Sequence, residues 1–173
     1  MSLPERFTTL RLTAERIREE HTHDIHRMLQ DPEQMAMLGG VPAVGETAAY
    51  MTRSLEHWEQ HGFGVWILRD RLQQVVAGRV LLRHLLLDSR DEIELGYSLL
   101  PCLWGKGLAA EAALACLSLA RERLHVASVV ALTRPDHLRS QRVMMNIGMH
   151  YESNVTINGE PRVLFRANTA ADG

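Results

Sequence analysis

The pattern of apolar and polar residues predicts alternating strands and helices along this chain. From Glu92 to Leu99, apolar residues at odd positions alternate with polar or small residues at even positions, which is the period of a half-buried strand. Pro101 ends this strand, because proline cannot donate a hydrogen bond to a sheet ladder. The alanine- and leucine-rich stretch that follows, up to Arg123, predicts a helix that is apolar on most of its surface and therefore buried.

The same patterns predict further elements on either side of this unit. The expected strands cover residues 7–17, 64–68, 75–87, 92–99, 126–133, 151–157 and 162–166. Helices are expected from near Thr22, over residues 47–61, in the buried stretch and over residues 138–146. The three strands before the buried helix form an antiparallel meander, and the strand after it can lie parallel to the Glu92 strand because a helix connects the two.

Length and composition suit one globular domain. The chain has 173 residues, of which 46% are hydrophobic and 23% are charged. A formal net charge of -2 gives no electrostatic footprint for nucleic acid, and no apolar run approaches the length of a membrane span. Residues 1–6 contain no apolar signal core, so we expect a cytoplasmic protein with no nucleic acid or membrane partner.

A glycine-containing loop before the buried helix is the strongest candidate for a binding site. Its sequence is Trp104-Gly105-Lys106-Gly107-Leu108-Ala109-Ala110. The first N–H groups of a helix lack backbone partners and carry partial positive charge, and glycines let a phosphate approach closely. On these residues alone, a strand-to-helix turn with an exposed lysine explains the loop equally well.

Two phosphate-binding motifs fit this loop poorly. Gly105-x-Gly107-x-x-Ala110 matches the dinucleotide fingerprint, but residues 101–104 separate it from its strand, and too little chain follows for the parallel units of a dinucleotide fold. A P-loop is excluded because the loop lacks Gly-Lys-Ser/Thr at the required spacing.

The loop instead resembles the W-G-x-G-x-A-x-E-A loop of the RimJ/RimL-like group, within the GCN5-related N-acetyltransferase (GNAT) superfamily. Three further segments agree with that group in order and spacing. Residues 9–12 resemble its opening T-x-R-L strand, residues 94–97 its E-I-G-Y strand, and residues 140–149 its late helix ending in L-G-F/M. The resemblance covers about residues 8–150.

This resemblance implies an α/β fold in a single N-acetyltransferase domain over residues 1–173. The GNAT-like sheet is expected to be mixed and twisted, with about six or seven strands and with helices on both faces. It is expected to be splayed between its fourth and fifth strands, at residues 92–99 and 126–133, to admit acetyl-CoA. A closing hairpin at residues 151–166 and a tail at residues 167–173 complete the chain.

The resemblance also implies an acetyl-CoA-dependent N-acetyltransferase. Such an enzyme moves acetyl to a primary amine, of a protein N-terminus or of a small molecule, by direct attack in a ternary complex. The residues expected to bind the cofactor are Tyr97, Ser98, Leu99, Trp104, Gly105, Lys106, Gly107, Leu108, Ala109, Ala110, His137 and Ser140. The alternative is an acyl-CoA-binding sensor or interaction domain with weak or no turnover, because His137 replaces the asparagine of the group's N-x-x-S pattern. The resemblance leaves a homodimer open.

Glu94, Ser140 and Tyr151 are the catalytic residues that the resemblance implies. In the family, a carboxylate on the Glu92 strand often takes the proton from the attacking amine, directly or through water. Alternation alone equally allows Glu92 and Glu94 to be a solvent-facing carboxylate pair. The hydroxyls of Ser140 and Tyr151 could protonate the leaving thiolate or bind the cofactor, although Tyr151 is more simply explained as an ordinary strand aromatic.

Neither metal nor covalent chemistry is expected. His57 and His61 have the i, i+4 spacing of a metal site, but no third ligand is evident, so we predict no metal. Cys102 and Cys116 suit reduced thiols rather than a disulfide framework. Cys102 lies near a helix start, yet acetyl-CoA is already an activated thioester, so passing acetyl to a second thiol gains no driving force.

Overall fold

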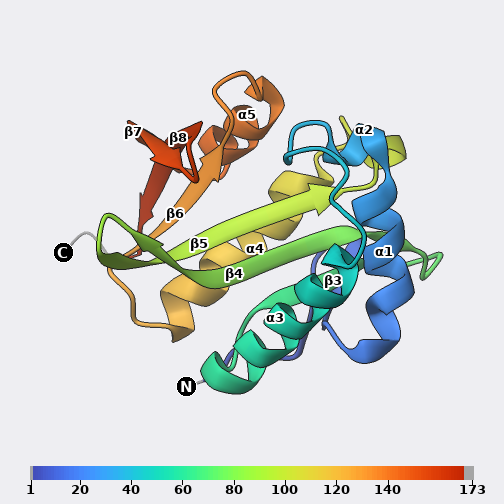
Figure 1. The fold of residues 1–173 in the computed structure, drawn as a ribbon. Helices are drawn as coiled ribbons and strands as arrows, with labels where there is room; N and C mark the ends of the chain where they lie inside the picture. The colour runs from blue at the N-terminus through green and yellow to red at the C-terminus, as the bar shows by residue number, and fades with distance from the viewer. Residues whose placement is uncertain (1, 170–173) are drawn as a thin grey trace.

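The computed structural model describes residues 2–169, so Met1 and residues 170–173 of the predicted tail lie outside the described residues. One sheet runs in the order β1-β2-β3-β4-β5-β6-β8-β7. Its strands are β1 (Arg6–Thr8), β2 (Leu12–Arg16), β3 (Val65–Asp70), β4 (Val76–Leu87), β5 (Arg90–Leu99), β6 (Ser128–Thr133), β7 (His150–Ile157) and β8 (Glu160–Asn168). All neighbouring strands are antiparallel except β5 and β6, so the predicted mixed sheet is confirmed (Figure 1).

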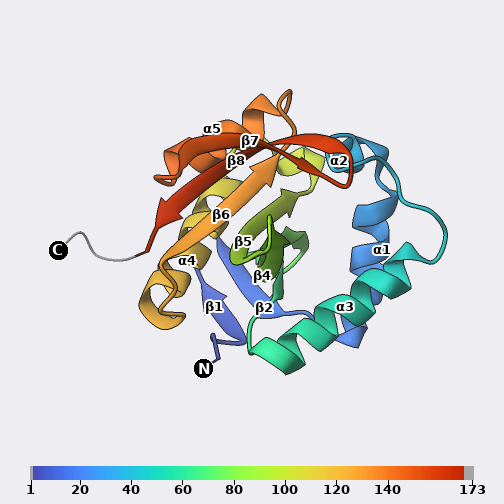
Figure 2. The same cartoon turned by 60° about the vertical axis from the view of Figure 1, so that its left-hand side comes forward.

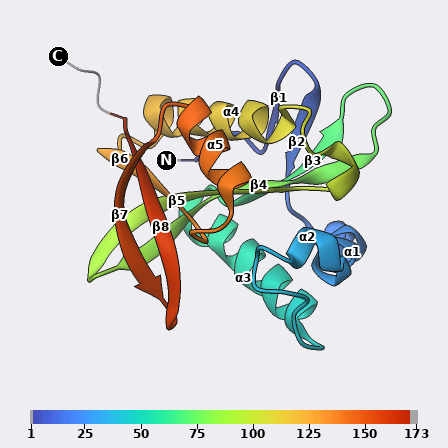
Figure 3. The ribbon, with the colours of Figure 1, turned by 90° about the horizontal axis from the view of Figure 1, so that it is seen from above.

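Helices cover both faces of the sheet, as predicted. The helices of one face are α1 (Thr22–Gln30), α2 (Pro32–Met35) and α3 (Glu46–His61). Those of the other face are α4 (Leu108–Arg123) and α5 (Leu138–Asn146). Figure 2 and Figure 3 show the two groups on opposite sides of β4 and β5. The 3-10 turns η1 (Glu19–His21) and η2 (Pro101–Leu103) complete the elements, and no helix within residues 2–169 has the length and hydrophobicity that crossing a membrane needs.

The core explains why α4 is apolar on nearly every side. Ala112, Ala113, Cys116 and Leu117 are fully buried against the sheet, and their small side chains let the helix lie close to β4 and β5. On the α3 face, Trp66 of β3 packs edge-on against Trp58, with ring centroids 5.1 Å apart. The central strands are therefore packed on both faces, by α4 on one side and by α3 on the other.

The sheet is split between β5 and β6. These strands pair at a single position, Glu94 with Val130, and Figure 1 shows β6 turning away from β5. Beyond Glu94, the backbone of β5 therefore has no partner strand on this side within residues 2–169. The predicted splay is confirmed.

The prediction of a single first strand over residues 7–17 is wrong. This segment forms the two strands β1 and β2, because the Thr9 hydroxyl accepts a hydrogen bond from the Leu12 N–H at 3.1 Å and closes a turn, leaving Leu10 83% exposed. The sheet consequently has eight strands rather than six or seven, and the split falls between its fifth and sixth strands. The closing hairpin is confirmed, but β8 continues to Asn168, so the first residues of the expected tail belong to the sheet.

Candidate active site

Two cavities meet at the split between β5 and β6. The first, of about 210 Å³, is lined by the glycine-containing loop, α5 and the end of β5. The second, of about 400 Å³, is lined by β4, β5, α3 and the loop at residues 39–42. The residues that line both cavities are Leu38, Tyr97, Ser98, His137 and Ser140. A group bound at this junction can be approached from either cavity.

The glycine-containing loop forms one wall of the first cavity and leads into the start of α4. Gly107 caps the helix with φ +77°, a left-handed conformation that favours glycine. The first hydrogen bond of the helix runs from the Glu111 N–H to the Gly107 carbonyl at 3.1 Å, so the N–H groups of residues 108–110 have no acceptor within the helix. Arg139 and Arg142 of α5 line the same cavity. This combination of helix start and arginines suits a phosphate-bearing ligand.

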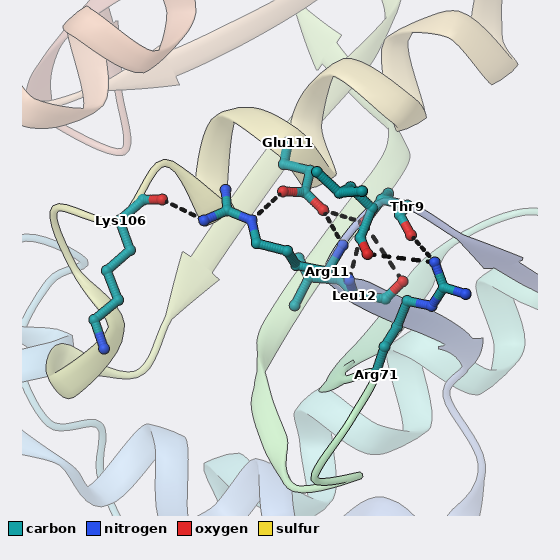
Figure 4. A network of polar contacts seen from close by, with 7 residues as sticks. Thr9, Arg11, Leu12, Arg71, Lys106 and Glu111 are labelled. Carbon is teal, nitrogen blue, oxygen red and sulfur yellow. Dashed lines mark hydrogen bonds and ion pairs between the residues drawn. The ribbon is translucent and has the colours of Figure 1, made fainter.

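Arg11 and Glu111 fasten this loop to the β1–β2 turn (Figure 4). The Glu111 carboxylate accepts hydrogen bonds from the Thr9 hydroxyl at 2.5 Å, the Arg11 N–H at 2.7 Å and Arg11 Nε at 2.7 Å. Arg11 Nη1 also donates to the Lys106 carbonyl at 2.8 Å. Burial alone would raise the pKa of Glu111, but these hydrogen bonds and the Arg11 charge outweigh burial and lower it. The T-x-R-L and glycine-loop motifs therefore form one network.

Lys106 lies differently from the other loop residues expected to bind a cofactor. Its side chain is exposed and lines neither cavity, and Figure 4 shows it extending away from the network around Arg11. The other expected cofactor-binding residues, including Trp104, Leu99 and residues 107–110, line the first cavity. Among the loop side chains, Trp104 is held by a hydrogen bond from its Nε1 to the Leu99 carbonyl at 2.9 Å and lies under the Arg139 guanidinium at 3.7 Å.

Tyr97 and Ser140 place two hydroxyls at the junction of the cavities. The Tyr97 hydroxyl donates to the Ser140 carbonyl at 2.9 Å and lies 3.0 Å from Ser140 Oγ. Burial raises the pKa of Tyr97 to about 12, with the hydrogen bond to Ser140 acting in the opposite direction. Tyr97 is therefore a neutral hydrogen-bonding group over the physiological pH range.

Glu94 lies in the second cavity, whereas Glu92 does not. Glu94 is only 8% exposed, and its Oε2 accepts a hydrogen bond from Arg83 Nε at 2.6 Å. The Arg83 side chain is half exposed, and the partial loss of water around it would lower its pKa, but the neighbouring Glu94 carboxylate outweighs this and raises it. Glu92 instead pairs with Arg166 at 2.9 and 3.0 Å and lines neither cavity. The two carboxylates are thus not a solvent-facing pair.

His137 and Tyr151 differ in their relation to the cavities. His137 precedes α5 and lines both, with its Nδ1 3.1 Å from Thr133 Oγ1. Burial lowers the pKa of His137, and the charge of Arg139 acts in the same direction. Tyr151 is 56% exposed, donates to Asn154 Oδ1 at 3.1 Å and lines neither cavity. The structure brings Glu94 and Ser140 to the same cavity but leaves Tyr151 outside it.

Several cavity residues carry no sequence motif. Gln34 of α2 donates from Nε2 to Ser98 Oγ at 2.8 Å, and Tyr50 of α3 and Arg79 of β4 line the second cavity. The only signal for Arg79 is a charged residue within the stretch from Val76 to Leu82, where the other residues are apolar or glycine. Within residues 2–169 no group of three metal-ligating side chains is placed to hold a metal.

A family model described as an acetyltransferase (GNAT) domain matches residues 11–150. The chain belongs to the GNAT acetyltransferase family. This match begins within the β1–β2 turn and includes β5, the glycine-containing loop, β6 and α5, so the motif segments lie within it or, for residues 9–10, at its edge.

Known proteins resemble this chain at low sequence identity. The uncharacterised protein YkkB of Bacillus subtilis is 25% identical over 138 residues, which cover 80% of each chain. An acetyltransferase from Agrobacterium tumefaciens has a TM-score of 0.83 at 24% identity, covering 96% of this chain and 95% of its own. RimL, a ribosomal L7/L12 alpha-N-protein acetyltransferase solved in complex with coenzyme A, has a TM-score of 0.75 at 16% identity, covering 97% and 98%.

GNAT membership confirms that this chain is an acetyl-CoA-dependent N-acetyltransferase at the level of the family. The resemblance to the RimJ/RimL-like group agrees with RimL being among the proteins that share its fold. The acceptor and the roles of the individual site residues stay predictions.

Proposed function

We propose that this protein transfers acetyl from acetyl-CoA to a primary amine by direct attack within a ternary complex. The observation that carries this proposal is the meeting of the two cavities at Tyr97, Ser98 and Ser140. One cavity has the features of a phosphate site, and the other contains a buried carboxylate. Holding two substrates at one junction lowers the barrier to transfer, because the reacting groups no longer have to meet in solution.

In this proposal, acetyl-CoA occupies the first cavity. The free N–H groups at residues 108–110, with Arg139 and Arg142, bind its phosphates. The unpaired edge of β5 at residues 97–99 binds the pantetheine arm as an added strand would. The thioester then lies at the junction, beside Ser140.

Glu94 takes the proton from the attacking amine. Arg83 binds its Oε2, which fixes the carboxylate and leaves Oε1 to accept the proton directly or through a water molecule. As the new C–N bond forms, the C–S bond breaks and negative charge collects on sulfur. Tyr97 donates its hydroxyl proton to the Ser140 carbonyl and so fixes the position of Ser140, whose own hydroxyl turns its proton from Tyr97 to the thiolate and stabilises it. Tyr151 lies outside both cavities, so it has no part in this step.

The test is thiol release from acetyl-CoA with a panel of amines, comprising small primary amines and peptides with free N-termini. We expect thiol release that requires both substrates, with one N-acetylated product found by mass spectrometry. Tight acetyl-CoA binding by calorimetry without thiol release from any amine would contradict the proposal. That result would favour the acyl-CoA sensor, which the histidine at position 137 suggests as the alternative.

A further inference from the structure

Arg79 is a buried arginine with no acid beside it. It is 8% exposed, faces the second cavity from β4, and pairs with Ser98 of β5 in the sheet register. Its Nη1 is buried without a hydrogen-bond partner, and none of the ion pairs within residues 2–169 includes it. A buried charge is costly unless it is paired, so this position favours an anionic ligand.

Tyr50 of α3 supplies a second polar group at the same place. The Arg79 guanidinium carbon lies 4.8 Å from the centre of the Tyr50 ring. The Tyr50 hydroxyl is also buried without a hydrogen-bond partner. The ring restrains the guanidinium, whose fork of N–H donors matches a carboxylate. A carboxylate has enough lone pairs to accept from the phenol as well.

The other charged residues of this cavity are already paired. Arg83 pairs with Glu94 at 2.6 Å, and Glu46 pairs with Arg53 at 3.5 Å. Within residues 2–169, Arg79 is therefore the cavity's one cation without an ion-pair partner. Arg79 and Arg83 are the cross-strand partners of Ser98 and Glu94. The proposed base and the unpaired cation therefore lie on one face of the sheet, four register positions apart, or roughly 13 Å along the strands at about 3.3 Å per residue.

We propose that the amine acceptor is a small molecule that also carries a carboxylate, which Arg79 and Tyr50 bind while its amine faces Glu94. This inference rests on the proposed function and names its substrate class. A cavity of about 400 Å³ suits a small molecule rather than a folded protein surface.

The test compares amines that differ only in the carboxylate. Thiol release is measured with α- and ω-amino acids of increasing length and with the carboxamide of each. Hydrogen bonds to a charged group in a buried site are worth about 1.5–3 kcal/mol, so kcat/KM should favour the best amino acid over its carboxamide by roughly 10- to 100-fold. In Arg79→Gln this ratio should fall toward one, and in Tyr50→Phe it should fall less. The exposed Arg27 supplies the matched control, and Arg27→Gln should keep the wild-type ratio.

If Arg79→Gln does not fold, Arg79→Lys replaces it in this test. Lysine keeps the charge but cannot bind a carboxylate in the bidentate manner, so the ratio of kcat/KM for amino acid over carboxamide should be intermediate. A wild-type ratio near one, or an unchanged ratio in a folded Arg79 variant, would overturn the inference. Turnover confined to peptides would overturn it as well.

A binding measurement separates this inference from the proposed function. Butanoate carries the carboxylate without the amine, and its binding is followed by calorimetry against butanamide. Butanoate should bind the wild-type protein and not Arg79→Gln. If no amine releases thiol but butanoate binds through Arg79, acetyl transfer fails and the carboxylate site stands. If butanoate does not bind, the carboxylate site is refuted.

Discussion

Replacing Glu111 by glutamine should loosen the cofactor loop and destabilise the whole domain. The side chain of Glu111 is 16% exposed and accepts three hydrogen bonds from Thr9 and Arg11, which lie about a hundred residues earlier in the chain. Glutamine has nearly the same shape but no charge, and its amide NH₂ cannot accept from these donors. At least one donor therefore loses its partner.

The size of the effect follows from the exposure of each partner. A hydrogen bond to a charged group contributes about 1.5–3 kcal/mol when partly buried. The Arg11 side chain is 46% exposed, so its ion pair adds about 1 kcal/mol or less. Because the three bonds share one carboxylate they do not add fully, and we expect the free energy of unfolding to fall by about 2–4 kcal/mol.

The loss should also depend on pH. The pKa of Glu111 in the folded protein lies below its ordinary value of 4.5, because its hydrogen bonds outweigh burial. The unfolded chain therefore binds more protons in this range, and the stabilisation is present above pH 4.5 and disappears as pH falls through the lower, folded-state pKa.

Urea unfolding at neutral and at acidic pH checks both points. Glu122→Gln, at an exposed position on the same helix, is the matched control and should change stability little. Wild-type stability in Glu111→Gln at neutral pH would refute the role of the network. A difference from wild type that stayed the same below the folded-state pKa would refute the electrostatic reasoning.

Further outcomes are expected at the site and at His57. Glu94→Gln should lower turnover by about 10²- to 10⁴-fold with little change in acetyl-CoA affinity, and Glu92→Gln should lower turnover less. Equal losses of turnover in the two variants, measured in initial-rate assays, would exclude Glu94 as the base. Cys102→Ser and Cys116→Ser should each retain activity, and mass spectrometry after acetyl-CoA alone should find no acetylated cysteine; parallel initial-rate plots with an inactive Cys102→Ser would instead indicate a covalent route. Burial lowers the pKa of His57 below its ordinary value of 6.5, although the hydrogen bond to the Phe63 carbonyl acts in the opposite direction. The neutral His57 ring therefore stabilises the folded protein above pH 6.5, and this stabilisation is lost as the pH falls through the folded-state pKa. Urea unfolding should therefore show a steeper loss of stability below that pH in the wild type than in His57→Gln, and identical curves would contradict this.

Local patterns were enough to predict most of the sheet and helices. Strand alternation, Pro101 and the glycines before α4 are local signals, and each marks a real boundary in the structure. The β1–β2 turn was missed because it contains neither glycine nor proline. The Thr9 hydroxyl closes it, and that hydroxyl donates to Glu111, which lies 102 residues later in the chain.

The cofactor loop was predictable, whereas the acceptor cavity was not. The loop is one continuous segment with a recognisable motif. Arg79 and Tyr50 come together only because α3 packs over β4. The glycine at position 78 is also explained by a tertiary contact, because a Cβ there would lie 2.2 Å from the Ser98 carbonyl oxygen. Contacts of this kind depend on strand register and helix packing, which no short stretch of sequence specifies.

Calorimetric titration of acetyl-CoA into a Gly107→Val variant tests the central claim most directly. A β-branched side chain at the start of α4 should block the approach of a phosphate to the helix N–H groups, so the variant should remain folded but lose acetyl-CoA binding. Gly159→Val is the matched control, because Gly159 has nearly the same φ, +79° against +77°, and lies in the β7–β8 turn away from both cavities. That control should bind acetyl-CoA as the wild type does. Undiminished affinity in a folded Gly107→Val protein would contradict the account, because the loop would then not hold the cofactor.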